Sequence, residues 1–371
     1  MRDANFDHLA NPYVCELVPY TPGKPIEELE RELGIQHSIK LASNENPLGA
    51  SPKAIEAAAL SLSSPELYPD ANGFYLKEAL AKRHDLPAEC ITLGNGSNEV
   101  LVFLAQAFLN PTVSAVYSQY AFAVYPIVTQ QMGAKHREVP ALAVDHPMAL
   151  GHDLRAMYKA VGAETRLVFI ANPNNPTGTW LSSERVRDFV ASLPPHVICV
   201  LDEAYTEYGD EKSDPRLWIE ECPNLVITRT FSKAYGLAGL RVGYALSHPA
   251  VADLLNRIRP PFNVSSVGLA AARAALDDEA FIVKSRQVNQ AGMNQLSKGL
   301  KELGIRTTPS QANFLLAHFE DSVDLINSEL MNNGVIVRPV KNYGLANALR
   351  ITIGTQAQNE RLISVLEQVL N

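Results

Sequence analysis

The feature that most constrains the fold is a regular alternation of short apolar segments and helical segments between residues 90 and 265. The expected strands are Ile91–Leu93, Val113–Tyr117, Leu167–Ile170, Val197–Leu201, Leu225–Thr228 and Gly243–Leu246. The expected helices between them are Asn98–Leu109, Phe122–Met132, Leu154–Gly162 and Glu184–Leu193. Strands that are apolar on both faces and alternate with helices are typical of a mostly parallel sheet with helices on both sides. We therefore expect a three-layer α/β/α domain whose ligands bind at the carboxyl ends of the strands.

The segments outside this region predict an arm and a smaller α+β unit. Residues 1–25 contain Pro12, Pro19, Pro22 and Pro25, which favour an extended arm over a packed element. The remaining expected helices are 26–33, 51–60, 74–84, 278–303, 321–333 and 356–370, and the remaining strands are 313–316, 335–337 and 349–353. A chain of 371 residues is long enough for about two domains. We divide it into an N-terminal arm (1–30), a small α+β domain (31–48 with 266–371) and a large domain (49–265).

The charge and composition argue against several classes of protein. The net charge of −8 disfavours nucleic acid or an anionic membrane as the main partner. No apolar run approaches the length of a membrane span, and the polar N-terminus is not typical of a signal peptide. The four cysteines have no metal-ligand spacing, so we expect no metal site and buried, reduced thiols in the cytoplasm.

The loop after the first expected strand, Gly94–Glu99, leads into a helix. Its glycines allow a sharp turn, and Ser97 is a good N-cap residue. The free N–H groups of the first helical turn, together with the helix dipole, could hold a phosphate group. A capped turn without a ligand explains the same residues, and the GK[ST] sequence of a P-loop is absent. This loop alone therefore leaves both interpretations open.

Aromatic and amide side chains follow the next two expected strands. The stretch Tyr120–Tyr125 could stack a ring on a flat ligand, although packing in the core explains it as well. The stretch Asn172–Gly178 has two X-Pro steps, which fix a non-helical path and present Asn175 from a rigid turn. Its three asparagines, clustered with prolines, exceed what a simple turn needs.

A carboxylate follows the fourth expected strand. Asp202 comes directly after an apolar segment, where an unpaired carboxylate is costly. It therefore needs a cation, which is either the protonated ring nitrogen of a ligand or an arginine of the protein. Tyr205, three residues farther along, could reach the same ligand.

A lysine follows the fifth expected strand. Lys233 lies among mostly uncharged residues, where burial can lower the pKa of an amine and make it a nucleophile. A solvated loop lysine is the alternative. Arg241 comes after Gly236 and Gly239, which we expect to let the backbone turn around a ligand.

Together these side chains form the set that pyridoxal 5′-phosphate requires. Its aldehyde takes a lysine as a Schiff base, and its ring nitrogen takes a carboxylate. Its 3′-oxygen takes phenol and amide donors, and its phosphate takes a helix end and an arginine. Each part alone is a weak signal, but their joint occurrence at the strand ends of one sheet predicts this cofactor.

Three blocks of the sequence resemble the signature blocks of fold-type-I aminotransferases. They are Asn172–Gly178, Asp202–Tyr205 and Ser232–Arg241. Further blocks are similar to those of the histidinol-phosphate aminotransferase family, namely Pro19-Tyr20, Ser43–Gly49, Tyr68-Pro69, Val337–Pro339 and Leu349–Thr355. The resemblance covers nearly the whole chain and implies the fold-type-I pyridoxal-phosphate transferase fold.

The resemblance implies a role for each matching residue. Catalytic roles fall to Lys233, which forms the Schiff base and moves the proton, to Asp202 at the ring nitrogen and to Tyr205 at the 3′-oxygen. The implied cofactor-binding residues are Ser97, Asn98, Phe122, Asn175, Asp202, Tyr205, Thr230, Ser232, Lys233 and Arg241, with Tyr68 reaching into the site of the other subunit of a homodimer. The implied substrate-binding residues are Tyr20, Asn44, Tyr125, Arg338 and Arg350.

The resemblance also implies a reaction. The expected enzyme moves the amino group of L-histidinol phosphate to 2-oxoglutarate in histidine biosynthesis, giving imidazole-acetol phosphate and glutamate with ping-pong kinetics. An aromatic amino-acid aminotransferase is the first alternative, and a phosphothreonine decarboxylase of the same fold is a second. A non-catalytic binding protein of this fold is disfavoured by the presence of Lys233.

Overall fold

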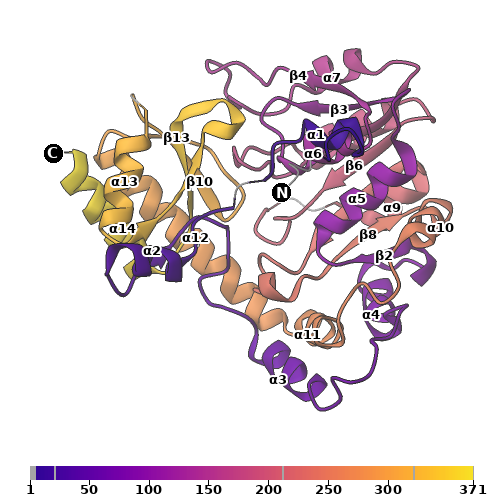
Figure 1. The fold of residues 1–371 in the computed structure, drawn as a ribbon, viewed down its shortest axis with the longest axis horizontal. Coiled ribbons are helices and arrows are strands. Elements are labelled where there is room, and N and C mark those ends of the chain that lie inside the picture. Colours follow the sequence, from indigo (N-terminus) through magenta and orange to yellow (C-terminus); the bar gives the residue numbers. More distant parts are fainter. Residues whose placement is uncertain (1–5, 21, 211–212, 321, 371) are drawn as a thin grey trace.

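A seven-stranded sheet forms the centre of the larger part of the molecule (Figure 1). The computed structural model describes residues 6–20, 22–210, 213–320 and 322–370. Residues 1–5 and 21 of the predicted arm, 211–212 of the predicted large domain, 321 of a predicted helix and 371 of the predicted small domain therefore lie outside it. The strand order is β2 (Ile91–Gly94), β8 (Gly243–Ser247), β7 (Leu225–Thr230), β6 (Ile198–Asp202), β5 (Thr165–Ala171), β3 (Ser114–Ser118) and β4 (Lys135–Val139). Only β8 runs against the others, since it is antiparallel to both of its neighbours and all remaining pairs are parallel.

The six predicted strands of this sheet are present, with ends that differ by a residue or two. The prediction missed β4, which lies at the edge of the sheet and has the polar sequence Lys-His-Arg-Glu-Val. Four of its five residues are exposed, so the apolar pattern that reveals buried strands is absent there.

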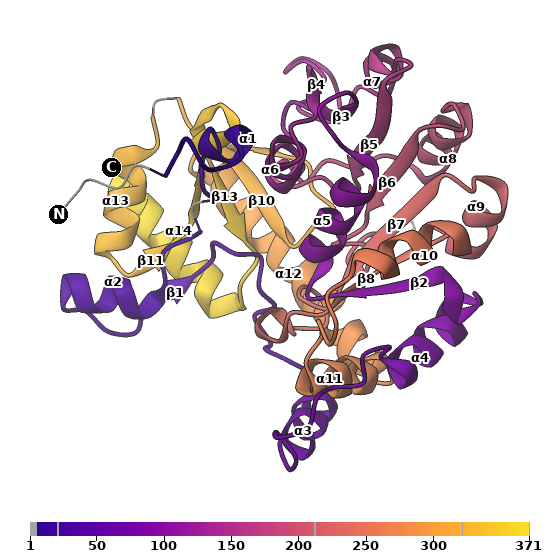
Figure 2. The ribbon, with the colours of Figure 1, turned by 45° about the vertical axis from the view of Figure 1, so that its right-hand side comes forward.

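Helices cover both faces of the sheet, as Figure 2 shows from a second direction. Successive residues of β5 point to opposite faces, so Val168 and Ile170 lie in one core while Leu167 and Phe169 lie in the other. The helices of this part are α3 (Pro52–Ser61), α4 (Phe74–His84), α5 (Ser97–Phe108), α6 (Val124–Gln131), α7 (Leu154–Ala160), α8 (Ser183–Ser192), α9 (Pro215–Glu221), α10 (Pro249–Ile258) and α11 (Ser266–Leu276). The three-layer prediction is therefore confirmed.

The prediction did not include α9, α10 and α11, although the first turns of α9 and α10 carry a proline that favours a helix start. Asp214 caps α9 and His248 caps α10, and in both helices a proline occupies the first turn. An aspartate at the N-cap and a proline in the first turn are favoured at helix N-termini, whereas a histidine N-cap is not among the preferred ones.

The smaller part is built on a four-stranded antiparallel sheet with helices on it. Its strand order is β12 (Arg338–Val340), β13 (Leu345–Thr352), β10 (Phe314–His318) and β9 (Arg306–Thr308). Helices α12 (Glu279–Glu302), α13 (Asp324–Asn332) and α14 (Gln356–Leu370) pack with this sheet in one apolar core. The short strand β1 (Ile39–Lys40) runs parallel to β11 (Val335–Ile336), which ties the segment after α2 (Ile26–Leu33) to this part.

The proposed division into an arm and two domains stays a prediction, but one boundary needs to move. Helix α11 packs on α3, and its Ala271 and Ala272 lie in the apolar core of the large sheet. We therefore propose that the large domain extends through α11.

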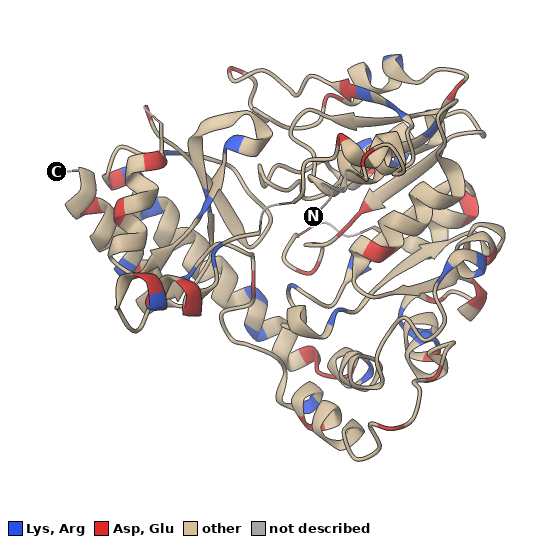
Figure 3. Cartoon of the chain, in the orientation of Figure 1, with Lys and Arg blue, Asp and Glu red and all other residues tan. Residues whose placement is uncertain are grey.

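The cysteines and the charges are distributed over the whole molecule. Cys90, Cys199 and Cys222 are buried free thiols, whereas Cys15, the last residue of the short helix α1 (Pro12–Cys15), is exposed, contrary to the expectation of four buried thiols. Acidic and basic residues are mixed along the outer helices (Figure 3). No helix within the described ranges has the length and apolar character to cross a membrane, and no cluster of metal-ligating side chains occurs among those residues.

Candidate active site

A cavity of about 260 Å³ lies at the carboxyl ends of three neighbouring strands of the large sheet. Ala171 at the end of β5, Asp202 at the end of β6 and Thr230 at the end of β7 all line it. Every predicted site residue except Tyr68 and Tyr125 lines this cavity, namely Tyr20, Asn44, Ser97, Asn98, Phe122, Asn175, Asp202, Tyr205, Thr230, Ser232, Lys233, Arg241, Arg338 and Arg350.

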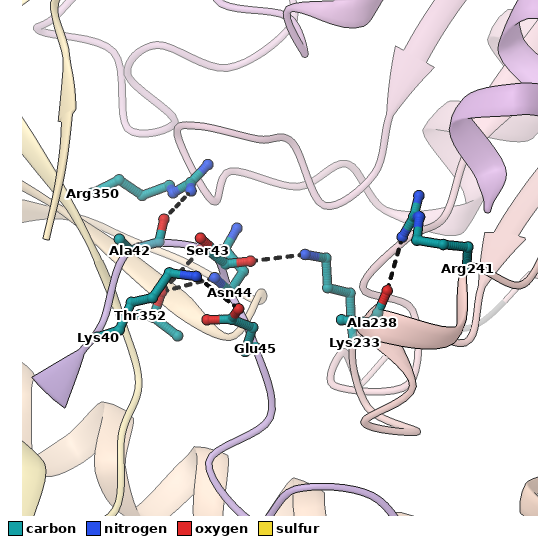
Figure 4. A network of polar contacts seen from close by, with 10 residues as sticks. All are labelled: Lys40, Ala42, Ser43, Asn44, Glu45, Lys233, Ala238, Arg241, Arg350 and Thr352. Carbon is teal, nitrogen blue, oxygen red and sulfur yellow. Dashed lines mark hydrogen bonds and ion pairs between the residues drawn. The ribbon is translucent and has the colours of Figure 1, made fainter. Parts of the chain in front are cut away.

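Lys233 reaches across the cavity from the loop after β7. Its Nζ donates a hydrogen bond of 3.0 Å to the main-chain carbonyl of Ser43 (Figure 4). Burial lowers the pKa of Lys233 to about 7, and the charges of Arg350 and Arg241 act in the same direction. A substantial fraction of this amine is therefore neutral at neutral pH.

The turn after Lys233 requires a glycine at one of the two predicted positions. Gly236 has φ +71°, and a Cβ there would lie 1.9 Å from the carbonyl oxygen of Gly49. A Cβ on Gly239 would have no neighbour within 4 Å among the described residues, so the protein itself does not require a glycine there, and the expected role of this second glycine beside a ligand stays a prediction. The positive φ near this position belongs to Arg241 itself (53°).

Asp202 lies buried at the end of β6, and two hydroxyl groups donate hydrogen bonds to it. Tyr125 donates to Oδ2 at 2.8 Å and Thr228 donates to Oδ1 at 3.0 Å. Burial raises the pKa of this carboxyl group, and the two hydroxyl donors act against that rise. No lysine or arginine of the described part of the chain forms an ion pair with it.

The arginine of the neighbouring strand β7 pairs with Glu203, the residue after Asp202, and not with Asp202 itself. Arg229 of β7 donates from Nε and Nη2 to Oε2 of Glu203, at 2.9 and 2.7 Å. The protein therefore provides an internal cation for Glu203, and the Asp202 carboxylate, which lines the cavity, is available to a ligand.

The segment Ala42–Glu45 connects residues on opposite walls of the cavity, and its main-chain contacts were not predicted. Besides the Ser43 carbonyl, the Ala42 carbonyl accepts a bond of 2.7 Å from Nη2 of Arg350 (Figure 4). The Asn44 side chain donates to the hydroxyl of Tyr205 at 2.9 Å. Main-chain carbonyls carry no sequence signal, so only the spatial arrangement reveals these contacts.

Arg350 of β13 is buried and oriented by three groups, namely the Ala42 carbonyl, the Asn175 side chain and the Phe314 ring. Its Nη1 donates to Oδ1 of Asn175 at 2.6 Å, and its guanidinium lies 5.3 Å from the ring centre of Phe314. Its Nε is buried without a hydrogen-bond partner among the described residues. Because Arg350 also lines the cavity, its guanidinium can meet an anion that enters there.

The opposite end of the cavity has the character of an anion site. Helix α5 starts there with Ser97 and Asn98, and Arg241 donates to the Ala238 carbonyl at 3.0 Å beside the hydroxyl of Ser232. The N-cap of α5 is Gly96 (φ +84°) and not Ser97, so the predicted capping role of Ser97 is wrong.

Gly96 has a steric reason to be a glycine. A Cβ on this residue would lie 2.4 Å from Nη2 of Arg241. The missing side chain lets the guanidinium approach the free N–H groups of the first turn of α5. A cation, a helix N-terminus and hydroxyl groups at one place favour a phosphate group.

Two predicted residues do not reach the cavity. Tyr125 has no exposed surface and stacks on Phe169 with ring centres 4.6 Å apart, so the predicted substrate contact is wrong. Tyr68 is 81% exposed and stacks on Phe262 at 4.7 Å, outside the cavity of its own chain. Phe122 does line the cavity, with its ring edge-on to Tyr125.

The arm and the small sheet form the remaining wall of the cavity. The guanidinium of Arg338 lies 5.6 Å from the ring centre of Tyr20, which is a cation–π distance. The arm, which carries no core of its own, is thereby brought to the cavity.

The chain is similar to known aminotransferases over nearly its whole length. The family model described as aminotransferase class I and II matches residues 36–366. Histidinol-phosphate aminotransferase 1 of Nitrosococcus oceani is 54% identical, over 100% of this chain and 99% of its own, and histidinol-phosphate aminotransferase 2 of Pseudomonas fluorescens is 54% identical, over 99% and 98%. The crystal structure of histidinol-phosphate aminotransferase from Sinorhizobium meliloti in complex with pyridoxal-5′-phosphate is similar, with a TM-score of 0.88, 30% identity and coverage of 97% of both chains.

Proposed function

We propose a function from the premise that this chain belongs to the class I and class II aminotransferases, and within them to the histidinol-phosphate aminotransferase family. On this premise it moves the amino group of L-histidinol phosphate to 2-oxoglutarate, giving imidazole-acetol phosphate and glutamate in histidine biosynthesis. The observation that carries the proposal is that the Lys233 amine and the Asp202 carboxylate face one cavity. Each is the residue type that the family's chemistry needs at that place.

The cofactor of the proposed reaction is pyridoxal 5′-phosphate, and the side chains of the cavity fit it. The Asp202 carboxylate forms no ion pair with a lysine or arginine among the described residues, and Gly96 leaves the N-terminus of α5 open toward Arg241. We propose that Ser97, Asn98, Thr230, Ser232 and Arg241 hold the phosphate, Asn175 and Tyr205 the 3′-oxygen, Asp202 the ring nitrogen and Phe122 the ring face.

The chemistry divides between the cofactor and the protein. When bound, pyridoxal phosphate supplies an aldehyde for a Schiff base and a ring that accepts electrons from the substrate carbon. Lys233 Nζ takes the proton from the donor carbon, because a pKa of about 7 leaves much of the amine neutral at neutral pH. The Ser43 carbonyl orients Nζ, and Asp202 places a negative charge where the ring nitrogen carries its proton.

The proposed substrate contacts use two arginines on neighbouring strands. Arg350, whose Nε has no partner within the described residues, is assigned to the α-carboxylate of glutamate. Arg338, together with Tyr20, is assigned to the phosphate of histidinol phosphate or the γ-carboxylate of glutamate. One site can thereby accept two donors of different shape.

The active form in this proposal is a cytoplasmic homodimer in which Tyr68 reaches the site of the other subunit. Tyr68 follows α3 in the chain, and α3 presents the exposed apolar residues Ile55 and Leu60. A solvent-exposed aromatic side chain near such residues is typical of a subunit interface.

A panel of amine donors with 2-oxoglutarate tests the proposal. We expect histidinol phosphate to give the highest kcat/KM, with parallel double-reciprocal plots and no turnover by the Lys233→Ala variant. Preference for phenylalanine or tyrosine would favour an aromatic aminotransferase, and release of carbon dioxide from phosphothreonine would favour a decarboxylase. Intersecting plots would contradict the ping-pong scheme.

A further inference from the structure

Two hydroxyl groups hold the Asp202 carboxylate from the side that faces away from the cavity. Tyr125 of α6 donates to Oδ2, and Thr228 of β7 donates to Oδ1. Both donors are fully buried, and neither lines the cavity. Each oxygen of the carboxylate is thus bonded by a residue that cannot itself touch a ligand.

The direction of the Tyr125 hydroxyl is fixed by the packing of its ring. The ring stacks almost parallel on Phe169, at 4.6 Å and 9°, and Phe122 contacts it edge-on at 5.8 Å and 88°. Phe169 belongs to β5, the neighbour of the strand that ends in Asp202. Tyr125 therefore contacts both the carboxylate and the aromatic ring that lines the cavity.

The two hydroxyl groups also affect the charge of Asp202. Burial favours the neutral acid and raises its pKa, and the neighbouring Glu203 adds to this effect. Hydrogen bonds from Tyr125 and Thr228 stabilise the carboxylate instead. If Asp202 were protonated, it could not provide the negative charge that a protonated ring nitrogen requires.

We propose that Tyr125 is a positioning residue that keeps Asp202 ionised and aimed at the ring nitrogen of the cofactor, with Thr228 as the second donor. The inference rests on the proposed function, since it needs pyridoxal phosphate in the cavity. It adds to that function a pair of buried residues that act only through the carboxylate.

The test compares two cofactors that differ at a single ring atom. Binding to the cofactor-free, full-length protein is measured for pyridoxal phosphate and for its analogue with C–H in place of the ring nitrogen. We expect Tyr125→Phe to weaken the binding of pyridoxal phosphate by roughly tenfold or more, the size of a hydrogen bond to a charged group, and to leave binding of the analogue unchanged. Thr228→Val should behave in the same way, and Thr228→Ser, which keeps the hydroxyl, should bind both as the wild type does.

A matched control separates this effect from a general loss of buried hydroxyl groups. Tyr117 on β3 is also buried, and its hydroxyl is 2.6 Å from Nδ1 of His136, so Tyr117→Phe should not change the affinity for either cofactor. As an independent readout, the ¹⁵N NMR signal of ring-labelled cofactor should report a protonated nitrogen in the wild type and a loss of that proton in Tyr125→Phe.

The outcomes are distinct. Equal loss of affinity for both cofactors in Tyr125→Phe would show a merely structural role and overturn the inference, as would no loss for either. If Tyr125→Phe does not fold, the Thr228 pair decides by the same comparison. A wild-type protein that binds neither cofactor would overturn the proposed function itself, a result distinct from a failure of the variants alone.

Discussion

Replacing Lys233 with methionine should stabilise the cofactor-free protein while abolishing its activity. The folded chain holds this amine with a pKa of about 7, whereas an unfolded lysine has the ordinary value of 10.5. At pH 7 this difference costs the folded state about 4 kcal/mol, since the unfolded chain binds the proton much more tightly. Methionine removes that cost and loses the hydrogen bond to the Ser43 carbonyl, a loss of about 1 kcal/mol. We therefore expect a net gain of about 3 kcal/mol at pH 7.

The pH dependence of this gain identifies its cause. Between pH 7 and 10.5 the unfolded wild-type chain binds more protons at Lys233 than the folded chain, so wild-type stability rises with pH. The gain of Lys233→Met should accordingly shrink by about 2 kcal/mol between pH 7 and pH 9. Urea unfolding of both cofactor-free proteins, followed by circular dichroism at the two pH values, measures it.

A surface lysine provides the control for this measurement. Lys298 on α12 is highly exposed, so Lys298→Met should show no pH-dependent change relative to the wild type. A Lys233→Met variant that is less stable than the wild type at pH 7, or whose gain is the same at both pH values, would refute the argument that burial makes this amine costly.

Three further perturbations test other parts of the site. Arg338→Ala should lower kcat/KM for histidinol phosphate by roughly tenfold to a hundredfold, the size of a charge-assisted contact, and lower kcat/KM for phenylalanine much less. Equal kcat/KM values for wild type and variant in steady-state assays would contradict the assignment. Gly96→Ala should weaken cofactor binding measured by absorbance titration, because the new Cβ would lie 2.4 Å from Nη2 of Arg241. An unchanged dissociation constant would show that the guanidinium can move away freely. Glu203→Gln should lower the free energy of unfolding by about 3–5 kcal/mol in urea titrations, since it removes the carboxylate that pairs with the buried Arg229. A loss of stability of only ~1 kcal/mol, the value of an exposed ion pair, would mean that water reaches the guanidinium.

The sequence determined the fold class and the residue types of the site. Apolar strands that alternate with helices dictate a parallel sheet, and a parallel sheet brings the carboxyl ends of its strands to one edge. Asp202 and Lys233 could therefore be assigned to one site from their positions at strand ends alone. The edge strand β4 escaped prediction because its exposed residues are polar.

The tertiary structure decided which of these side chains line the cavity and which are buried behind the residues that line it. Tyr125 and Phe122 are three residues apart in an aromatic stretch, yet packing against Phe169 buries Tyr125 behind Asp202 while Phe122 faces the cavity. The main-chain carbonyl of Ser43 receives the Lys233 amine only because chain segments 190 residues apart are folded together. Carbonyl groups are identical at every position, and the direction of a ring depends on its neighbours in space, so neither contact has a signature in the sequence.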